Sequence, residues 1–160
     1  IESLDGVRSV RNIQMIQDGK PIAGASSLWV VLNTEKKRPD GIAINHDHLT
    51  KHPDLKATQK DYDRVDLNIK TKKIADYKVK YSDLDIVKHV NNVKYLEWCL
   101  DYIPVEILEN NGIKALDLNY LNELNYQDEV SIEISEIIEN SIYLYIKKSE
   151  KIYFALKIEI

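Results

Sequence analysis

Hydrophobic and polar residues alternate along most of the second half of the chain, a pattern typical of strands that bury one face. The alternation is clearest around Val130, Ile132 and Ile134, and it recurs in two later segments. The connections between these segments are short and polar, so they should form an antiparallel meander. We therefore expect strands at residues 129–138, 141–148 and 151–160.

One segment repeats its hydrophobic residues at helical spacing instead. It predicts an amphipathic helix over residues 91–103, with its apolar side formed by Val93, Leu96, Leu100 and Ile103. Asn91 or Asn92 can cap the first turn, and Pro104 should end the helix. Cys99 lies on the apolar side, where a free cysteine behaves as a core residue.

Two further strands are expected on either side of this helix, at residues 72–81 and 114–123. The order of strand, helix and four strands predicts an α+β unit over residues 71–160, with an antiparallel sheet wrapped around one long helix. We expect three tyrosines on the outer face of this sheet: Tyr143, Tyr145 and Tyr153.

The first half of the chain has a different organisation. Residues 7–17 and 22–32 predict a hairpin that turns at Asp18-Gly19, a strong two-residue turn signal. Residues 34–70 show no sustained period and predict an ordered linker. Residues 1–33 therefore resemble the end of a first unit that has lost its front, and the start at Ile1 rather than Met fits missing preceding residues.

Composition excludes several classes of protein. The 160 residues carry 22 Lys and Arg against 26 Asp and Glu, a net charge of −4, so no basic surface for nucleic acid is expected. No apolar run approaches the roughly 18 residues of a membrane span, and no secretory leader is visible. The single cysteine excludes an internal disulfide and fits a reducing, cytoplasmic location.

The densest group of chemically active residues joins a strand to the helix start, within residues 81–95. It contains Asp83, Asp85, His89, Asn91 and Asn92. A helix N-terminus can stabilise a developing oxyanion, and a carboxylate beside an imidazole can activate water. The alternative is a polar cap, because Asp and Asn favour turns and His often satisfies a backbone group.

Two other groups offer weaker signals. A metal site is conceivable at His46, Asp47, His48, His52 and Asp54, but no period holds them on one face, so a solvated linker is the simpler interpretation. The basic run Lys36-Lys37-Arg38 either attracts an acidic partner or forms a solvated turn.

The residues around the helix start resemble a known family. Ser82-Asp-Leu-Asp, His89-Val-Asn-Asn-Val-Lys-Tyr95 and Glu97-Trp98 are similar to the signature of the second hotdog domain of acyl-acyl carrier protein thioesterases. Earlier segments resemble the end of that family's first hotdog domain: Arg8-Ser-Val-Arg11, Gly24-Ala-Ser-Ser-Leu-Trp-Val30 and Lys37-Arg-Pro39. The resemblance covers most of the chain in the right order, and implies a complete second and a partial first hotdog unit.

The resemblance also implies an activity, because the family hydrolyses the thioester between a fatty acyl chain and its carrier protein. The catalytic residues it implies are Asp85, His89 and Glu123, without metal or organic cofactor. Either Glu123 or Asp85 would be the general base, and His89 would fix the geometry or protonate the leaving thiolate. The implied partner is acyl carrier protein.

The backbone N–H groups of Val90, Asn91 and Asn92 are expected to form the oxyanion hole. The sequence departs from the family at two positions. Val87 stands where the family has an Asn that orients polar groups, and Leu124 stands where many members have a Cys. A cysteine nucleophile after Glu123 is therefore excluded.

Two alternatives stay open at this point. One is a single-hotdog acyl-CoA thioesterase, against which the linker and the upstream segment argue. The other is a non-catalytic acyl-binding or interaction module, which Val87 and the incomplete first unit favour. An uncovered hairpin would also favour a homo-oligomer, because an exposed apolar strand pair invites association.

Overall fold

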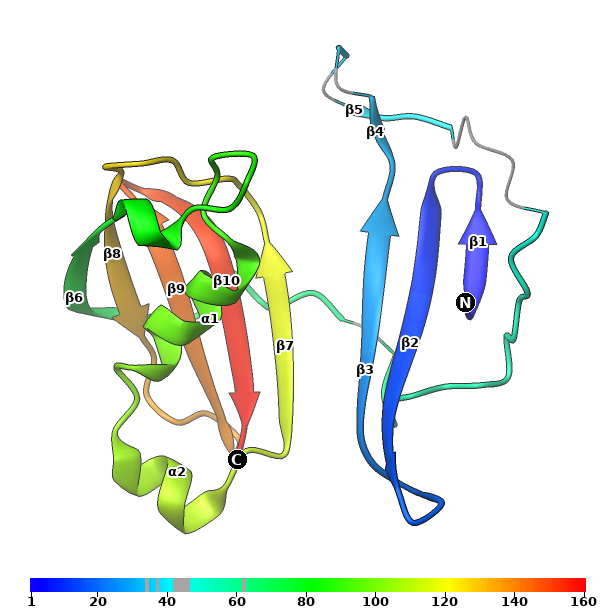
Figure 1. The fold of residues 1–160 in the computed structure, drawn as a ribbon. Helices are drawn as coiled ribbons and strands as arrows, with labels where there is room; N and C mark the ends of the chain where they lie inside the picture. The colour runs from blue at the N-terminus through cyan, green and yellow to red at the C-terminus, as the bar shows by residue number, and fades with distance from the viewer. Residues whose placement is uncertain (34, 37, 42–46, 62) are drawn as a thin grey trace. The chain divides into compact units, whose positions relative to one another are not determined.

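The computed structural model describes residues 1–33, 35–36, 38–41, 47–61 and 63–160, which divide into two compact units at residues 62 and 63. The larger unit contains a five-stranded antiparallel sheet in the order β6-β8-β9-β10-β7 (Figure 1). Its strands are β6 (Lys72–Lys78), β7 (Ala115–Tyr120), β8 (Glu129–Ile134), β9 (Ser141–Lys148) and β10 (Lys151–Glu159). The predicted meander is confirmed as β8-β9-β10.

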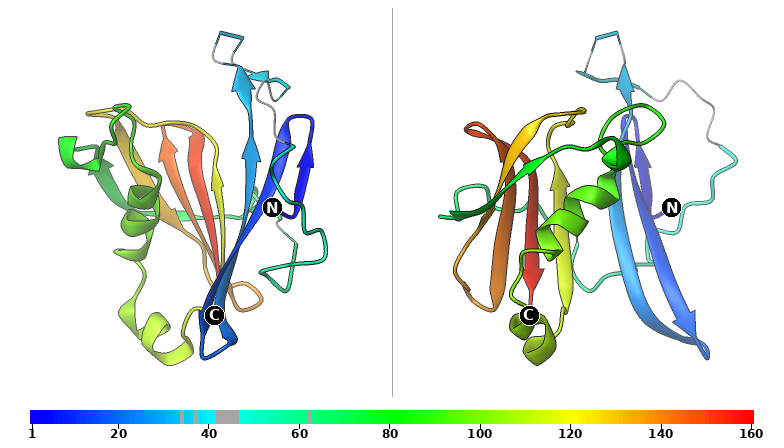
Figure 2. Two further views of the ribbon diagram at one scale, coloured as in Figure 1. Left: turned by 45° about the vertical axis from the view of Figure 1, so that its right-hand side comes forward. Right: turned by 60° about the vertical axis from the view of Figure 1, so that its left-hand side comes forward.

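Helix α1 (Asn92–Leu100) lies across one face of this sheet, as the views in Figure 2 show. Asn91 is its N-cap and accepts a hydrogen bond from the Val93 N–H, as predicted. Trp98 and Cys99 point into the core, where the Trp98 ring packs 4.4 Å from that of Tyr77. Burial raises the pKa of the Cys99 thiol, so Cys99 is an unreactive core residue, as expected.

A second helix was not expected from the sequence. The first helix ends at Leu100 rather than at the predicted Ile103, and Pro104, which was predicted to end it, is instead the N-cap of α2 (Val105–Asn111). Proline is tolerated at a helix start because the first N–H groups have no partner within the helix. Gly112, with φ 67°, follows α2 as its C-cap.

The opposite face of the sheet carries a smaller apolar cluster of Val65, Tyr145 and Ala155. The Tyr145 hydroxyl donates a hydrogen bond to the Asp66 carbonyl, and the Val65 N–H donates one to Asn119 Oδ1. Residues 63–70, which fall within the expected linker, therefore pack on the sheet of the larger unit.

The smaller unit is a three-stranded antiparallel sheet in the order β1-β2-β3. Its strands are β1 (Ser3–Asp5), β2 (Arg8–Gln17) and β3 (Lys20–Val30), and the predicted hairpin is confirmed. Asp18 and Gly19 both have positive φ, 50° and 75°, as the twist of a tight two-residue hairpin requires. The short strand β1 was not predicted.

Residues 55–57 of the expected linker are in contact with the smaller unit. Asn12 and Gln14 donate side-chain hydrogen bonds to the carbonyls of Leu55 and Lys56. A Cβ atom at Gly24 would lie 1.9 Å from the Ala57 carbonyl oxygen, so β3 and this segment approach too closely for any other residue.

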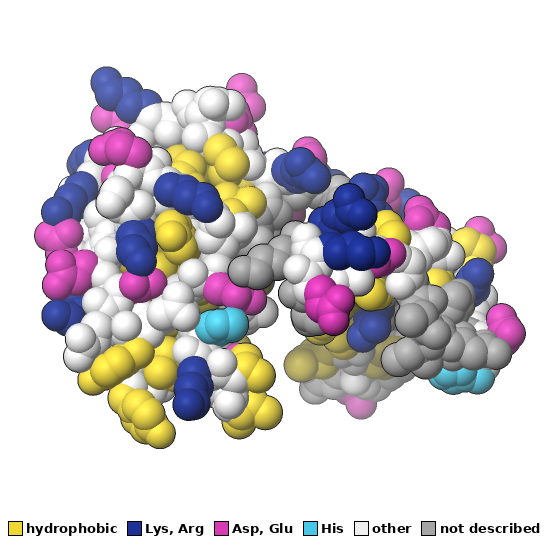
Figure 3. All heavy atoms as spheres, turned by 90° about the horizontal axis from the view of Figure 1, so that it is seen from above, with side chains coloured by type: hydrophobic (Ala, Val, Ile, Leu, Met, Phe, Trp, Pro, Cys, Tyr) yellow, Lys and Arg dark blue, Asp and Glu magenta, His cyan; other side chains and the backbone are white. Residues whose placement is uncertain are grey.

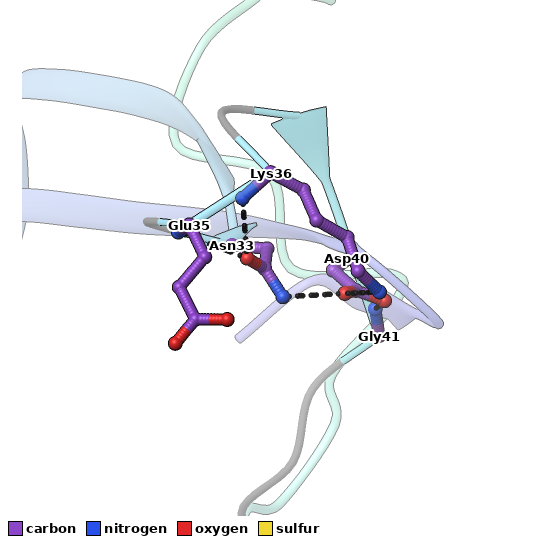
Figure 4. A network of polar contacts seen from close by, with 5 residues as sticks. All are labelled: Asn33, Glu35, Lys36, Asp40 and Gly41. Atoms are coloured by element: carbon purple, nitrogen blue, oxygen red, sulfur yellow. Dashed lines mark hydrogen bonds and ion pairs between the residues drawn. The ribbon is translucent and has the colours of Figure 1, made fainter.

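Lys36 of the basic run lies in a turn between β4 (Leu32–Asn33) and β5 (Arg38–Pro39), and Arg38 is the first residue of β5. Asn33 Oδ1 accepts hydrogen bonds from the N–H groups of Glu35 and Lys36, and Asn33 Nδ2 donates to Asp40 (Figure 4). Lys36 Nζ lies 3.5 Å from the same Asp40 carboxylate. The charge of Lys36 is therefore partly balanced within the turn, while Lys37 lies outside the described residues.

His46 also lies outside the described residues, so the conceivable metal site is described only in part. Within the described ranges, no group of three or more His, Cys, Asp or Glu side chains is placed to hold a metal ion. The same ranges contain no helix that is long and apolar enough to cross a membrane.

Candidate active site

The site begins with a tight loop between η1 (Tyr81–Asp83) and α1. Leu84 and Val90 pair across the loop as an antiparallel bridge. The Asp85 N–H donates to the His89 carbonyl at 2.8 Å, and the Lys88 N–H donates to the Asp85 carbonyl at 3.1 Å. Lys88 has φ 66°, a left-handed conformation that costs energy for a residue with a Cβ. The loop is thus a closed turn.

Asp85 braces this turn with its side chain. Asp85 Oδ1 accepts hydrogen bonds from the N–H groups of Val87 at 2.9 Å and His89 at 3.3 Å. Both bonds hold the backbone of the loop and so fix where the His89 side chain starts. The Asp85 carboxylate therefore stabilises the conformation of this loop.

His89 and Glu123 come together although they are far apart in the sequence. His89 Nδ1 lies 3.4 Å from Glu123 Oε2, and their side chains are 38% and 74% exposed. The carboxylate is therefore open to water while one of its oxygens is close to the imidazole. This arrangement can hold and activate a water molecule.

A short strand-like contact aligns the two segments. The Val90 N–H donates to the Leu124 carbonyl at 2.9 Å, and His89 pairs with Asn125 as an antiparallel bridge. Leu124 is fully buried, and its own N–H donates to the Tyr95 hydroxyl at 3.0 Å. The residue after Glu123 is therefore held in place on both sides.

The backbone N–H groups expected to form the oxyanion hole differ in whether the fold already uses them. The N–H groups of Val90 and Asn91 donate to the carbonyls of Leu124 and Asp83, at 2.9 and 2.8 Å. These two donors are already used in holding the fold. Among the described residues, no acceptor is found for the Asn92 N–H, so Asn92 is the member of the predicted set that can offer its N–H to a substrate oxygen.

Val87, at the position where the resemblance implies an Asn, is exposed beside this site. Its exposed fraction is 63%, and that of Ile86 is 98%. Figure 3 shows a histidine on the larger unit with an acidic side chain beside it and hydrophobic side chains gathered nearby. The loop therefore presents an apolar surface where the family pattern would place an amide.

Sequence reasoning did not assign two residues that support the site. Tyr95 binds the Leu124 N–H, and the 4% exposed Asp83 accepts hydrogen bonds from the Tyr77 hydroxyl and the Lys80 N–H. Burial, and then the hydrogen bond to Asp83, raise the pKa of Tyr77 to about 12. The spacing of four residues from Asn91 to Tyr95 was the available signal that Tyr95 lies one turn along the same helix face.

Comparisons with known proteins find similar sequences and folds. Residues 67–159 match the family model described as the acyl-ACP thioesterase C-terminal domain. The chain is 31% identical over 135 residues to a chloroplastic palmitoyl-acyl carrier protein thioesterase of Arabidopsis thaliana, a match that covers 76% of this chain and 32% of the relative. A chloroplastic oleoyl-acyl carrier protein thioesterase 2 of the same plant is 30% identical over 129 residues, with 74% and 35% covered.

Solved structures give the same picture. An acyl-ACP thioesterase from Bacteroides thetaiotaomicron aligns with a TM-score of 0.87 and 27% identity, covering 99% of this chain and 65% of that one. The 12:0-ACP thioesterase from Umbellularia californica aligns with a TM-score of 0.69 at 20% identity, covering 98% and 64%, which supports the fold alone. The predicted α+β class and hotdog fold are confirmed. The chain spans about a third of the length of the curated relatives.

Proposed function

Since this chain belongs to the acyl-ACP thioesterase family, whose C-terminal domain it carries, we propose that it hydrolyses the thioester of a fatty acyl-acyl carrier protein. The observation that carries the proposal is the pair of His89 and Glu123 at 3.4 Å, exposed to water beside the start of α1. The products would be a free fatty acid and the carrier-protein thiol, so that chain elongation ends.

In this proposal Glu123 is the general base. It takes a proton from water while the water oxygen attacks the thioester carbonyl carbon. Asn92 N–H is the backbone donor proposed for the developing oxyanion. When the intermediate collapses, the carbon–sulfur bond breaks and the leaving thiolate takes up a proton from Glu123 or His89. No metal or organic cofactor is needed for these steps.

Glu123 is favoured over Asp85 as the base because of what each carboxylate already binds. Asp85 Oδ1 accepts two backbone N–H groups of its own loop. Glu123 has only the His89 contact among the described interactions and is 74% exposed. A base must reach the water it activates, and Glu123 is the freer of the two. Asp85 is therefore proposed to act by holding His89 in place.

We also propose that residues 1–33 are the end of a first hotdog unit and residues 71–160 the catalytic unit. The alignment with the Bacteroides enzyme over 99% of this chain supports this organisation. The plant relatives are chloroplastic by name, whereas the location proposed here is the cytoplasm, which the single buried Cys99 fits.

A non-catalytic acyl-binding module remains the second candidate, because Val87 removes a polar group from the loop and exposes an apolar one. An acyl-CoA thioesterase is the third. The test is a parallel measurement of hydrolysis with acyl-carrier protein and acyl-CoA, beside binding of a non-hydrolysable acyl-carrier protein analogue. The proposal expects hydrolysis that is faster with acyl-carrier protein. Binding without hydrolysis, or a preference for acyl-CoA, would select one of the other candidates.

A further inference from the structure

The peptide group that follows Glu123 is buried and depends on one side chain for its N–H. Leu124 is 0% exposed. Its carbonyl accepts the Val90 N–H at 2.9 Å, and its N–H donates to the Tyr95 hydroxyl at 3.0 Å. A buried backbone group without a partner is costly, so both bonds contribute to fixing this peptide. The position of Glu123 therefore depends on where Tyr95 holds the next residue.

Tyr95 is itself rigidly placed. It is 2% exposed, and its ring lies 5.8, 5.7 and 5.5 Å from the rings of Trp98, Tyr120 and Phe154. Burial raises the pKa of Tyr95 by more than the hydrogen bond from the Leu124 N–H lowers it, and the nearby charge of Glu123 adds a smaller rise, so the hydroxyl stays protonated at neutral pH. A phenol in this state is a stable acceptor for the Leu124 N–H.

We propose that Tyr95 is a positioning residue that sets Glu123 against His89 through the Leu124 peptide. The inference rests on the proposed function, since it gives Glu123 the role of general base. Tyr95 belongs to α1, which begins directly after the loop that carries His89. The Tyr95 hydroxyl thus links the segment that contains Glu123 to α1, the helix that follows His89 in the chain. A small shift of Glu123 relative to His89 would lower the rate substantially.

The test is Tyr95→Phe, which keeps the ring and removes the hydroxyl. We expect kcat to fall about 10- to 100-fold, with KM changed by less than about twofold, because substrate binding does not use this bond. The matched control is Tyr145→Phe. Tyr145 is 1% exposed and its hydroxyl also bonds to backbone, at Asp66 on the other face of the sheet. The control should keep the parent kcat.

A double variant separates positioning from general loosening of the core. If Tyr95 acts through Glu123, Tyr95→Phe combined with Glu123→Gln should be no slower than Glu123→Gln alone. A further loss equal to that of Tyr95→Phe by itself would overturn the proposal. An unchanged kcat in Tyr95→Phe would overturn it as well.

Amide hydrogen exchange tests the same bond without relying on activity. In Tyr95→Phe the Leu124 and Val90 amides should exchange at least about tenfold faster, whereas in Tyr145→Phe they should not change. If the parent chain hydrolyses no thioester, the proposed function fails and this measurement alone decides. Equal exchange of Leu124 in the two variants would show that Tyr95 does not hold this peptide.

Discussion

At the scale of single residues, Val87 is the clearest departure from the motif that the resemblance implies, and one substitution restores that motif. Its N–H is already held by Asp85, and its side chain is 63% exposed, so an amide at this position has room to reach a substrate or water. We expect Val87→Asn to raise the rate of acyl-carrier protein hydrolysis by about tenfold or more, since one positioning group is worth about 10²–10³ in rate.

The matched control is Ile86→Asn, which makes the neighbouring 98% exposed residue equally polar. Initial rates of thiol release from both variants give the comparison. An unchanged or lower rate in Val87→Asn would mean that the site works around Val87 or serves binding only. An equal gain in Ile86→Asn would assign the effect to general polarity of the loop.

Two substitutions of Asp85 distinguish a general base from a residue that only holds the loop backbone in place. An Asn at this position retains an oxygen that can accept the N–H groups of Val87 and His89, whereas an Ala retains none. We expect Asp85→Asn to keep more than about a tenth of the parent rate and Asp85→Ala to lose about 10²-fold, because the loop then opens. Equal and near-complete loss in both variants would make Asp85 a catalytic base.

At the scale of helices and strands, two ion pairs join β9 to its neighbours. Lys147 Nζ lies 2.6 Å from Glu133 on β8, and Lys148 Nζ lies 2.6 Å from Asp128 in the turn before β8. Burial raises the pKa of each carboxyl. The lysine contacts outweigh it together with the hydrogen bonds from Thr71 to Glu133 and from the Asn125 N–H to Asp128, so both pKa values lie below their ordinary values of 4.5 and 3.8.

A carboxyl with a lowered pKa in the folded state binds fewer protons there than in the unfolded chain. Its stabilising contribution is therefore complete above the ordinary pKa and is lost as the pH falls through the folded pKa. We expect the free energy of unfolding of the larger unit to decrease below about pH 4.5, measured by urea titration. Glu133→Gln and Asp128→Asn should flatten this decrease.

The control for the acid titration is Asp76→Asn. Asp76 pairs with Lys73 on the surface, where its side chain is 72% exposed. Exposed pairs contribute little, so this variant should follow the parent curve. If Glu133→Gln and Asp128→Asn also follow the parent curve, these pairs do not contribute to stability.

The hydrophobic period predicted most of the strands, because successive side chains of a strand lie on opposite faces of the sheet and so alternate in burial. It did not predict the register shift between Ile152 and Phe154 in β10. Tyr143 and Tyr145 belong to the outer cluster as expected, but Tyr153 packs against the core on the helix side. A β-bulge adds one residue to a strand, so the residues before it lie on the opposite face of the sheet from the one that simple alternation predicts. No local feature of the sequence marks this bulge.

The sequence predicted the part of the candidate site whose residues are close together in the chain. Asp85 and His89 fall in one loop because they are four positions apart, whereas Glu123 came from the family resemblance. The use of the Val90 and Asn91 N–H groups by Leu124 and Asp83 was not predictable. It depends on which carbonyls the tertiary fold brings to them, and the sequence period does not carry this information.

At the scale of the whole molecule, the hairpin of the smaller unit exposes large apolar side chains. The most exposed are Ile13, Met15, Ile16 and Ile22, at 68%, 62%, 61% and 56%. We expect the 160-residue polypeptide to associate with itself as its concentration rises, because exposed apolar strands pair readily. Light scattering should then give a mass above 18.6 kDa.

A variant with Ile13→Lys and Met15→Lys should shift this association to higher concentration, since charge on a strand face opposes pairing. Lysines at two exposed polar positions of the same strand, Gln14 and Gln17, add the same two charges and serve as the control. A monomer of 18.6 kDa at every concentration would contradict the expectation.

The central claim is that the His89–Glu123 pair hydrolyses acyl-carrier protein, and Glu123→Gln tests it most directly. The measurement is the initial rate of thiol release from a palmitoyl-carrier protein. The control is Glu129→Gln, since the Glu129 side chain is 77% exposed and pairs with Lys78 on the surface. We predict a rate lower by about 10²–10⁴ in Glu123→Gln and an unchanged rate in the control. A Glu123→Gln variant within about threefold of the parent, with its fold intact, would contradict the account.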